Sequence, residues 1–330
     1  MRPRSCIAYC SICGAAISQG WPINEDKRWQ QTAVLLHKED GPFPERRILE
    51  LDARNIAGDM YELNDAAKSI FASSYIGPYP GLRRPLYIPC HIQCLNIAKR
   101  AIFSKRPDPL HYLWLVLLSR NETPRPYIAQ SHERRLDPYR GCFINPNGHS
   151  ARQWIDQNVE EKEMHEADAL DIPDMTPSIC KYLEEISVSD LAKAEQTDGL
   201  PHLPQEITDL VWQHLCPLSN PPVACTRLVP PGQWHYALRD LKVLPWLWDI
   251  DTNVLDTKER TISVDRRWDW ELLIRRLANR DTYNVENNCD GDKHTTRLKV
   301  TRSIEGLPPG LRNRRRIWNL AIDMLDELDD

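Results

Sequence analysis

The sequence has no long apolar run. Its longest, residues 113–118, is much too short to cross a bilayer, and residues 1–11 hold no apolar stretch of the length found in signal peptides. Neither sign of charge dominates, because 42 lysines and arginines stand against 47 aspartates and glutamates, and the chain has no bulk attraction to nucleic acid or to an anionic membrane. We therefore expect an intracellular protein, cytoplasmic or nuclear, with no membrane partner.

The motifs that mark common catalytic sites are also missing. The chain has no glycine-rich phosphate loop, no His-Glu-x-x-His helix and no Gly-x-Ser-x-Gly turn. Asp249, Asp251 and Asn253 resemble the first ligands of a calcium loop. The sixth position of that loop holds Val254 instead of glycine and the twelfth holds Arg260 instead of glutamate, so the calcium interpretation fails. We expect a protein that is not an enzyme.

Two short pairs among the cysteines and histidines have the spacing of a metal site. Cys10-x2-Cys13 is followed at once by Gly14, whose missing side chain lets the backbone turn tightly. His91-x2-Cys94 falls at the predicted start of a helix, where the first turn aims both side chains the same way. Zinc takes four nitrogen or sulfur ligands in a tetrahedron, so the two pairs together predict one structural zinc ion in a treble-clef site.

Other assignments of these residues stay open. Cys6 and Cys90 are spare thiols that could replace a predicted ligand, and Cys90 makes the second pair ambiguous because it lies next to His91. The competing interpretation is a set of ordinary buried thiols with one surface histidine, and the matching half-sites favour zinc over it. The remaining cysteines are scattered, and we expect core thiols in a reducing compartment at Cys142, Cys180, Cys216, Cys225 and Cys289.

Hydrophobic periodicity predicts strands and then helices around the second pair. Strand-like runs occupy residues 32–37, 47–52 and 85–89. A helical pattern follows from His91 to Ile102, and a compact apolar helix covers residues 111–119. A treble clef needs this order of elements: a cysteine turn, then short strands, then a helix that carries the second ligand pair.

A second helix with a marked start lies in the middle of the chain. Leu203 and Pro204 open it, and proline is favourable there because its missing N–H would have had no partner. Glu206 suits the positive end of the helix dipole. One apolar stripe then runs along the helix, made of Leu203, Ile207, Leu210, Val211 and Leu215.

This leucine-proline helix, ahead of Trp234, resembles the F-box, a motif of about three helices. Residues 244–249, 268–273 and 306–318 resemble blocks that follow the F-box in many filamentous-fungal F-box proteins, which often also carry an N-terminal Cys-x2-Cys-Gly and a later His-x2-Cys. The chain departs from the family pattern in residues 217–222 and 229–232, where five prolines would break the second and third helices.

The resemblance implies an adaptor function. In that family the leucine-proline turn and the following helix dock on the Skp-type linker subunit of SCF ubiquitin ligases. The resemblance therefore implies an F-box-like substrate adaptor that binds this subunit and a protein client. The residues that it assigns to the linker-subunit contact are Leu203, Pro204, Ile207 and Leu210.

These patterns predict an α+β fold that is mainly helical, with a treble-clef-like zinc module and a helical C-terminal part. We expect a zinc-stabilised α+β module over residues 1–152, an acidic linker over 153–199, the F-box-like motif over 200–240 and a helical region over 241–330. Thirteen acidic residues and three lysines lie between residues 156 and 198, which favours a solvated, partly disordered linker with one helix over 178–194. We expect most of the eleven tryptophans in the core.

Two other functions stay open. In the first, the leucine-proline helix is buried against the C-terminal tryptophan helices, and the chain is a compact zinc-containing scaffold. The second is weak nucleic-acid binding through the zinc module and the arginine cluster of Arg312, Arg314, Arg315 and Arg316. Acidic residues follow these arginines closely, which favours a solvated face that pairs within its own protein and makes nucleic acid the least favoured partner.

Overall fold

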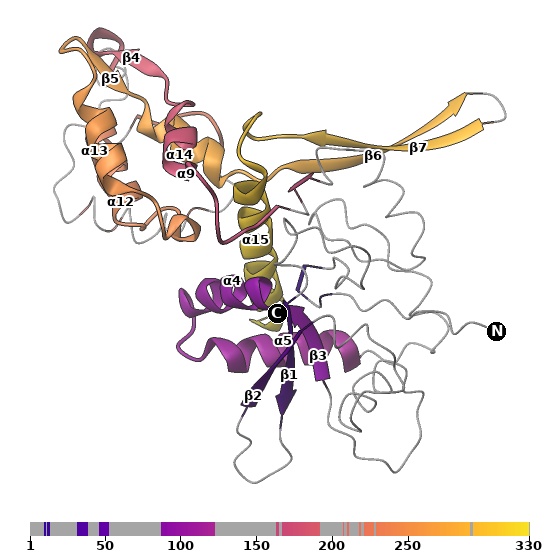
Figure 1. The fold of residues 1–330 in the computed structure, drawn as a ribbon. Helices are drawn as coiled ribbons and strands as arrows, with labels where there is room; N and C mark the ends of the chain where they lie inside the picture. The colour runs from indigo at the N-terminus through magenta and orange to yellow at the C-terminus, as the bar shows by residue number, and fades with distance from the viewer. Residues whose placement is uncertain are drawn as a thin grey trace, which may run out of the picture. The chain divides into compact units, whose positions relative to one another are not determined.

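The computed structural model describes residues 10, 12–13, 32–38, 46–52, 87–122, 163–164, 167–191, 207, 210, 218, 221–227, 229–290 and 293–329. Helices predominate over strands in this part of the chain, in agreement with the predicted mainly helical α+β class (Figure 1). Within these residues, none of the helices combines the length and the apolar character that a membrane span needs.

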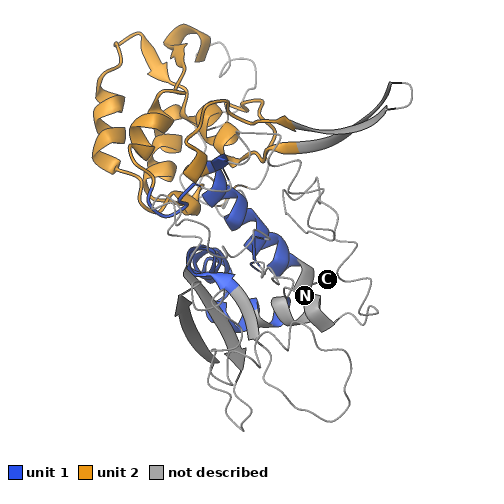
Figure 2. Cartoon of the chain, turned by 45° about the vertical axis from the view of Figure 1, so that its right-hand side comes forward, with its two compact units in different colours: residues 1–171, 287–297, 312–330 blue, residues 172–286, 298–311 orange. Residues whose placement is uncertain are grey.

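The chain forms two compact units, and each is built from segments distant in sequence (Figure 2). Unit 1 comprises residues 1–171, 287–297 and 312–330, and unit 2 comprises residues 172–286 and 298–311. This division differs from the four predicted segments, because the end of the chain belongs to the same unit as the two metal-ligand pairs. Composition could not show this, since contacts between distant segments decide it.

Unit 1 contains a three-stranded antiparallel sheet of β1 (Thr32–Lys38), β2 (Arg46–Asp52) and β3 (Tyr87–His91) in the order β2-β1-β3. Helix α4 (Ile92–Phe103) starts directly after β3, with His91 as its N-cap residue, and α5 (Pro109–Glu122) follows. These elements confirm the three strands and two helices predicted for this region. The sheet pairing places His91 opposite Ala33 of β1.

The acidic segment is folded where the structure describes it, so the expectation of a partly disordered linker was wrong for residues 167–191. Its acidic side chains have partners both within the segment and far from it in the sequence. Asp168 accepts hydrogen bonds from the N–H groups of Leu170 and Asp171, at 2.7 and 3.0 Å, and from Nε2 of Gln93 at 2.9 Å. In unit 2, Glu184 forms an ion pair with Arg276.

The single continuous helix predicted over residues 178–194 does not form. The chain instead forms the short helix α9 (Met175–Cys180) and then strand β4 (Glu185–Ser187), and helical backbone returns at residues 188–191. Strand β4 pairs antiparallel with β5 (Arg266–Trp268), with Glu185 opposite Trp268. Pairing with a strand about eighty residues away overrides the local helical pattern.

Unit 2 contains the helices α12 (Pro231–Arg239), α13 (Thr252–Arg260) and α14 (Trp270–Ala278) and the 3-10 helix η2 (Pro245–Leu247). Tryptophans on α12, η2, β5 and α14 pack in its interior. Trp234, Trp246, Trp268 and Trp270 are buried, as predicted for most tryptophans. Asp251, one of the residues that resembled a calcium loop, has a structural role. Its side chain caps α13 by accepting from the N–H groups of Asn253 and Val254.

Strands β6 (Thr282–Asp290) and β7 (Lys293–Thr301) pair with each other, and the long helix α15 (Pro309–Asp329) ends the described chain. The prolines at 230 and 231 do not break a helix, contrary to expectation. Pro231 begins α12 in the first helical position, where its lack of an N–H costs nothing.

One face of α14 and its C-terminal cap residue Asn279 hold the segment that begins at Pro221. Glu271, Arg275 and Asn279 follow one another at a spacing of four residues, so their side chains lie on the same side of the helix. Asn279 Nδ2 donates to the Pro221 carbonyl at 2.7 Å, and Arg275 Nη1 donates to the Pro222 carbonyl at 3.0 Å. Proline has no N–H to offer, but its carbonyl still needs a donor where water is excluded.

Glu271 is the buried centre of this contact, with an exposed fraction of 1%. Its carboxylate accepts from the N–H and the hydroxyl of Thr226, at 2.7 and 3.0 Å, and from the N–H of Arg227 at 3.1 Å. It also forms an ion pair with Arg275 Nε at 2.9 Å. The charge is tolerated in the interior because every one of these donors points at it.

Replacing Glu271 with glutamine is expected to destabilise the protein by about 3 kcal/mol or more, because the buried guanidinium of Arg275 loses its counter-charge. Glu185→Gln is the control, since Glu185 pairs with Arg266 and both side chains are about half exposed, and it should cost less than about 1 kcal/mol. Urea unfolding followed by tryptophan fluorescence measures both. Equal losses in the two variants would contradict the assignment of Glu271 as a structural clamp.

Candidate metal centre

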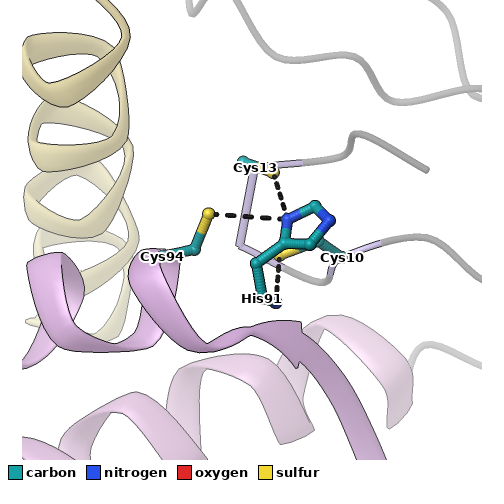
Figure 3. Close-up of side chains that lie close together, drawn as sticks. All are labelled: Cys10, Cys13, His91 and Cys94. Carbon is teal, nitrogen blue, oxygen red and sulfur yellow. Dashed lines mark hydrogen bonds between the residues drawn. The ribbon is translucent and has the colours of Figure 1, made fainter. Parts of the chain in front are cut away.

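The structure brings together all four residues predicted as metal ligands (Figure 3). One ligand atom from each of Cys10, Cys13, His91 and Cys94 lies within 4.8 Å of the others. All four side chains are buried, although 78 residues separate Cys13 from His91. The cluster joins the N-terminal cysteine turn to the junction between β3 and α4.

Distances at His91 fit a tetrahedral ion. Its Nδ1 lies 3.4 Å from Cys13 Sγ and 3.7 Å from Cys94 Sγ. A zinc ion with metal–sulfur bonds of about 2.3 Å and a metal–nitrogen bond of about 2.0 Å would hold such atoms about 3.5 Å apart. Figure 3 shows the ring turned so that Nδ1 faces both sulfurs, and Nδ1 is therefore the nitrogen available to a metal.

The backbone supports the cluster at the strand–helix junction. His91 ends β3, and its N–H donates to Cys10 Sγ at 3.3 Å. Cys94 follows in the first turn of α4, so the junction presents the imidazole and one sulfur to the same point. The direct transition from strand to helix thus positions two predicted ligands, and the His91 N–H at this junction donates to the sulfur of a third, Cys10.

The electrostatics of the cluster favour a thiolate together with a cation. Burial by itself would raise the pKa of Cys10, but hydrogen bonds from Cys13, Cys90 and Cys94 and the charge of His91 lower this pKa well below its usual range. Burial would lower the pKa of His91, but the negative charges of Cys10 and Cys13 raise it to about 10. Burial raises the pKa of Cys94, and the neighbouring Cys10 and Cys13 raise it further. A divalent cation would satisfy the same demand for positive charge.

Cys90 and Cys6 were the alternative ligands. Cys90 is fully buried and hydrogen-bonds Cys10, but it is not among the four described residues whose ligand atoms converge. The geometry therefore selects Cys94 over Cys90 as the partner of His91. Cys6 lies outside the described residues.

The arginine cluster of α15 is not the solvated face that we expected. Arg312, Arg314, Arg315 and Arg316 are all buried. Arg314 donates from Nε to the Ala169 carbonyl at 2.6 Å and from Nη2 to the Leu170 carbonyl at 3.0 Å. Since these side chains are enclosed, the observation that suggested nucleic-acid binding no longer supports it.

Sequence reasoning missed the contact of Arg316 with the cysteine turn. Its Nη1 donates to the carbonyl oxygen of Cys13 at 3.1 Å. One signal in the sequence could have indicated its burial, because Leu320 and Met324 follow it at a spacing of four and are buried on the same side of α15. The identity of its acceptor, 303 residues away, depends on the fold.

The predicted partner-binding residues are described in part. Ile207 and Leu210 have helical backbone, and their exposed fractions are 42% and 48%. Leu203 and Pro204 lie outside the described residues.

Comparison with protein-family models, with curated proteins and with solved structures found no match to the chain. The resemblance to fungal F-box proteins therefore rests on the sequence blocks alone and stays a prediction.

The cluster predicts that the purified chain carries about one metal ion, and that Cys94→Ser loses it because three ligands hold zinc far more weakly than four. Cys180→Ser is the matched control, because this buried thiol belongs to unit 2 and is not among the described residues whose ligand atoms converge. Elemental analysis of both variants gives the metal content. Wild-type protein without metal, or equal metal in the two variants, would contradict the site.

Proposed function

We propose that Cys10, Cys13, His91 and Cys94 hold a structural zinc ion in a treble-clef-like module. Three sulfurs and one imidazole nitrogen form a donor set that suits zinc, and four protein ligands leave no position open for a substrate. The ion would supply a tie between the cysteine turn and the β3–α4 junction. The burial of all four ligands supports a role in folding over a role in catalysis.

We further propose that the chain is a non-catalytic, F-box-like adaptor for the Skp-type linker subunit of an SCF ubiquitin ligase. The observation that carries this proposal is the exposed pair of Ile207 and Leu210. Side chains three residues apart share one face of a helix, so the two apolar groups form one surface. A partner protein that covers this surface would remove it from water.

The contact between α14 and the segment from Pro221 supports the same proposal. That segment follows the leucine-proline helix in the chain, and Glu271 and Arg275 fix it within unit 2. A binding helix whose flanking chain is held in place loses less conformational entropy on docking. The clamp therefore suits a helix that presents a surface to another protein.

Binding to the purified linker subunit tests the adaptor proposal. The variants are Ile207→Asp alone and Ile207→Asp combined with Leu203→Asp. Both place charge in an apolar contact and should weaken binding to the linker subunit by about thirtyfold or more. Val264→Asp is the matched control, because Val264 is 91% exposed in the same unit but lies outside the leucine-proline helix. Titration calorimetry gives the dissociation constants, with circular dichroism to verify folding.

Two outcomes would remove the adaptor proposal. One is a wild-type chain that does not bind the linker subunit at all. The other is equal binding by the wild-type chain and by the double variant, which would show that the leucine-proline helix is not the docking surface.

A further inference from the structure

A buried arginine from the end of the chain contacts the cysteine turn of the metal centre. Arg316 of α15 is 7% exposed, and its Nη1 donates to the Cys13 carbonyl at 3.1 Å. Its Nη2 donates to Asn313 Oδ1 at 3.0 Å, which orients the guanidinium. Cys13, Asn313 and Arg316 all belong to unit 1.

The net charge of the zinc-bound site would favour a positive side chain at this contact. One divalent ion with three thiolates and a neutral imidazole carries a net charge of about minus one. A net charge in the interior is costly unless an opposite charge lies near it. The guanidinium of Arg316 is a positively charged group, is enclosed, and donates to the backbone of a predicted ligand residue.

We propose that Arg316 is a positioning residue of the metal centre. It holds the cysteine turn through the Cys13 carbonyl and offsets the net negative charge of the loaded site, so that metal binding and the packing of α15 within unit 1 stabilise each other. This inference rests on the proposed zinc site. Thermodynamic linkage makes the coupling reciprocal.

Two further hydrogen bonds extend the coupling to the acidic segment. Asn313 Nδ2 donates to the Ala167 carbonyl at 3.0 Å, which ties α15 to the acidic segment. In the same segment Asp168 accepts from Gln93, which lies between the two metal ligands at the start of α4. The β3–α4 junction with its ligand pair, the acidic segment, α15 and the cysteine turn are thus linked by hydrogen bonds within one unit.

Arg314 provides a matched control on the same helix. It is also buried and also donates to backbone carbonyls, but those belong to Ala169 and Leu170 and not to a ligand residue. Loss of Arg314 should destabilise unit 1 whether or not metal is bound. Loss of Arg316 should weaken the metal-bound form in particular.

The test is a competition for Zn²⁺ between the full chain and a chromophoric chelator, with wild type, Arg316→Gln and Arg314→Gln. Arg316→Gln is expected to weaken zinc binding about tenfold more than Arg314→Gln does, in the range found for residues that support metal ligands. Equal weakening in the two variants would overturn the role of Arg316. Wild-type protein that binds no zinc would instead overturn the metal site itself.

A lysine pair keeps the test decisive if Arg316→Gln does not fold. Arg316→Lys keeps the charge but not the planar fork that reaches both Cys13 and Asn313, so it should weaken zinc binding more than Arg314→Lys. Equal affinities in the two lysine variants would overturn the proposal.

Hydrogen exchange of the wild-type chain tests the reciprocal effect. Removing zinc with a chelator is expected to raise amide exchange in residues 312–326 of α15, because the metal-bound turn no longer anchors Arg316. The helix α14 in unit 2 is the internal control and should not change. Unchanged exchange in residues 312–326 would also overturn the coupling.

Discussion

Unit 1 depends on one physical constraint, which is that three thiols and an imidazole are buried together where their electrostatics favour a thiolate beside a cation. Polar and ionisable groups are costly in the interior unless they are paired. The ligands lie in segments 78 residues apart, so satisfying them forces the cysteine turn against the β3–α4 junction. The sheet supports this placement, because pairing with β1 fixes the end of β3 at His91. The proposed charge balance of a zinc-bound site would account for the buried guanidinium that α15 brings to the Cys13 carbonyl.

Unit 2 provides partners for its buried polar and charged groups without a metal-cluster residue among those described. It uses carboxylates and guanidinium groups of its own, arranged at a spacing of four residues from Glu271 to Asn279. The segment that they hold is rich in proline and can make no regular helix, so its carbonyls depend on side-chain donors. Arg227 shows the result, because its left-handed backbone (φ 58°) is held by its N–H bond to Glu271 and by its ion pair with Asp269.

Local signals in the sequence predicted local structure well. The strands β1 to β3, the helix α4 and the two ligand pairs follow from periodicity and spacing within a few residues. The failures at the acidic segment and at the arginines of α15 share one cause, which is a partner far away in the chain. The acidic segment is folded because Asp168 meets Gln93, and its predicted helix gives way to β4 because β5 pairs with it. The buried state of Arg316 was hidden because arginine is usually exposed, and only the fold supplies its acceptor.

The two proposals rest on different parts of the chain. All four cluster residues and Arg316 belong to unit 1, whereas Ile207, Leu210 and the clamp at Glu271 belong to unit 2. Within unit 2, an ion pair and hydrogen bonds to the backbone hold the segment after the leucine-proline helix. Among the described residues that make these contacts, none belongs to the metal cluster. A zinc ion would therefore stabilise unit 1 without forming part of the surface proposed for the linker subunit. Loss of the metal and loss of linker binding are separate failures, and each can be assigned to its own set of contacts.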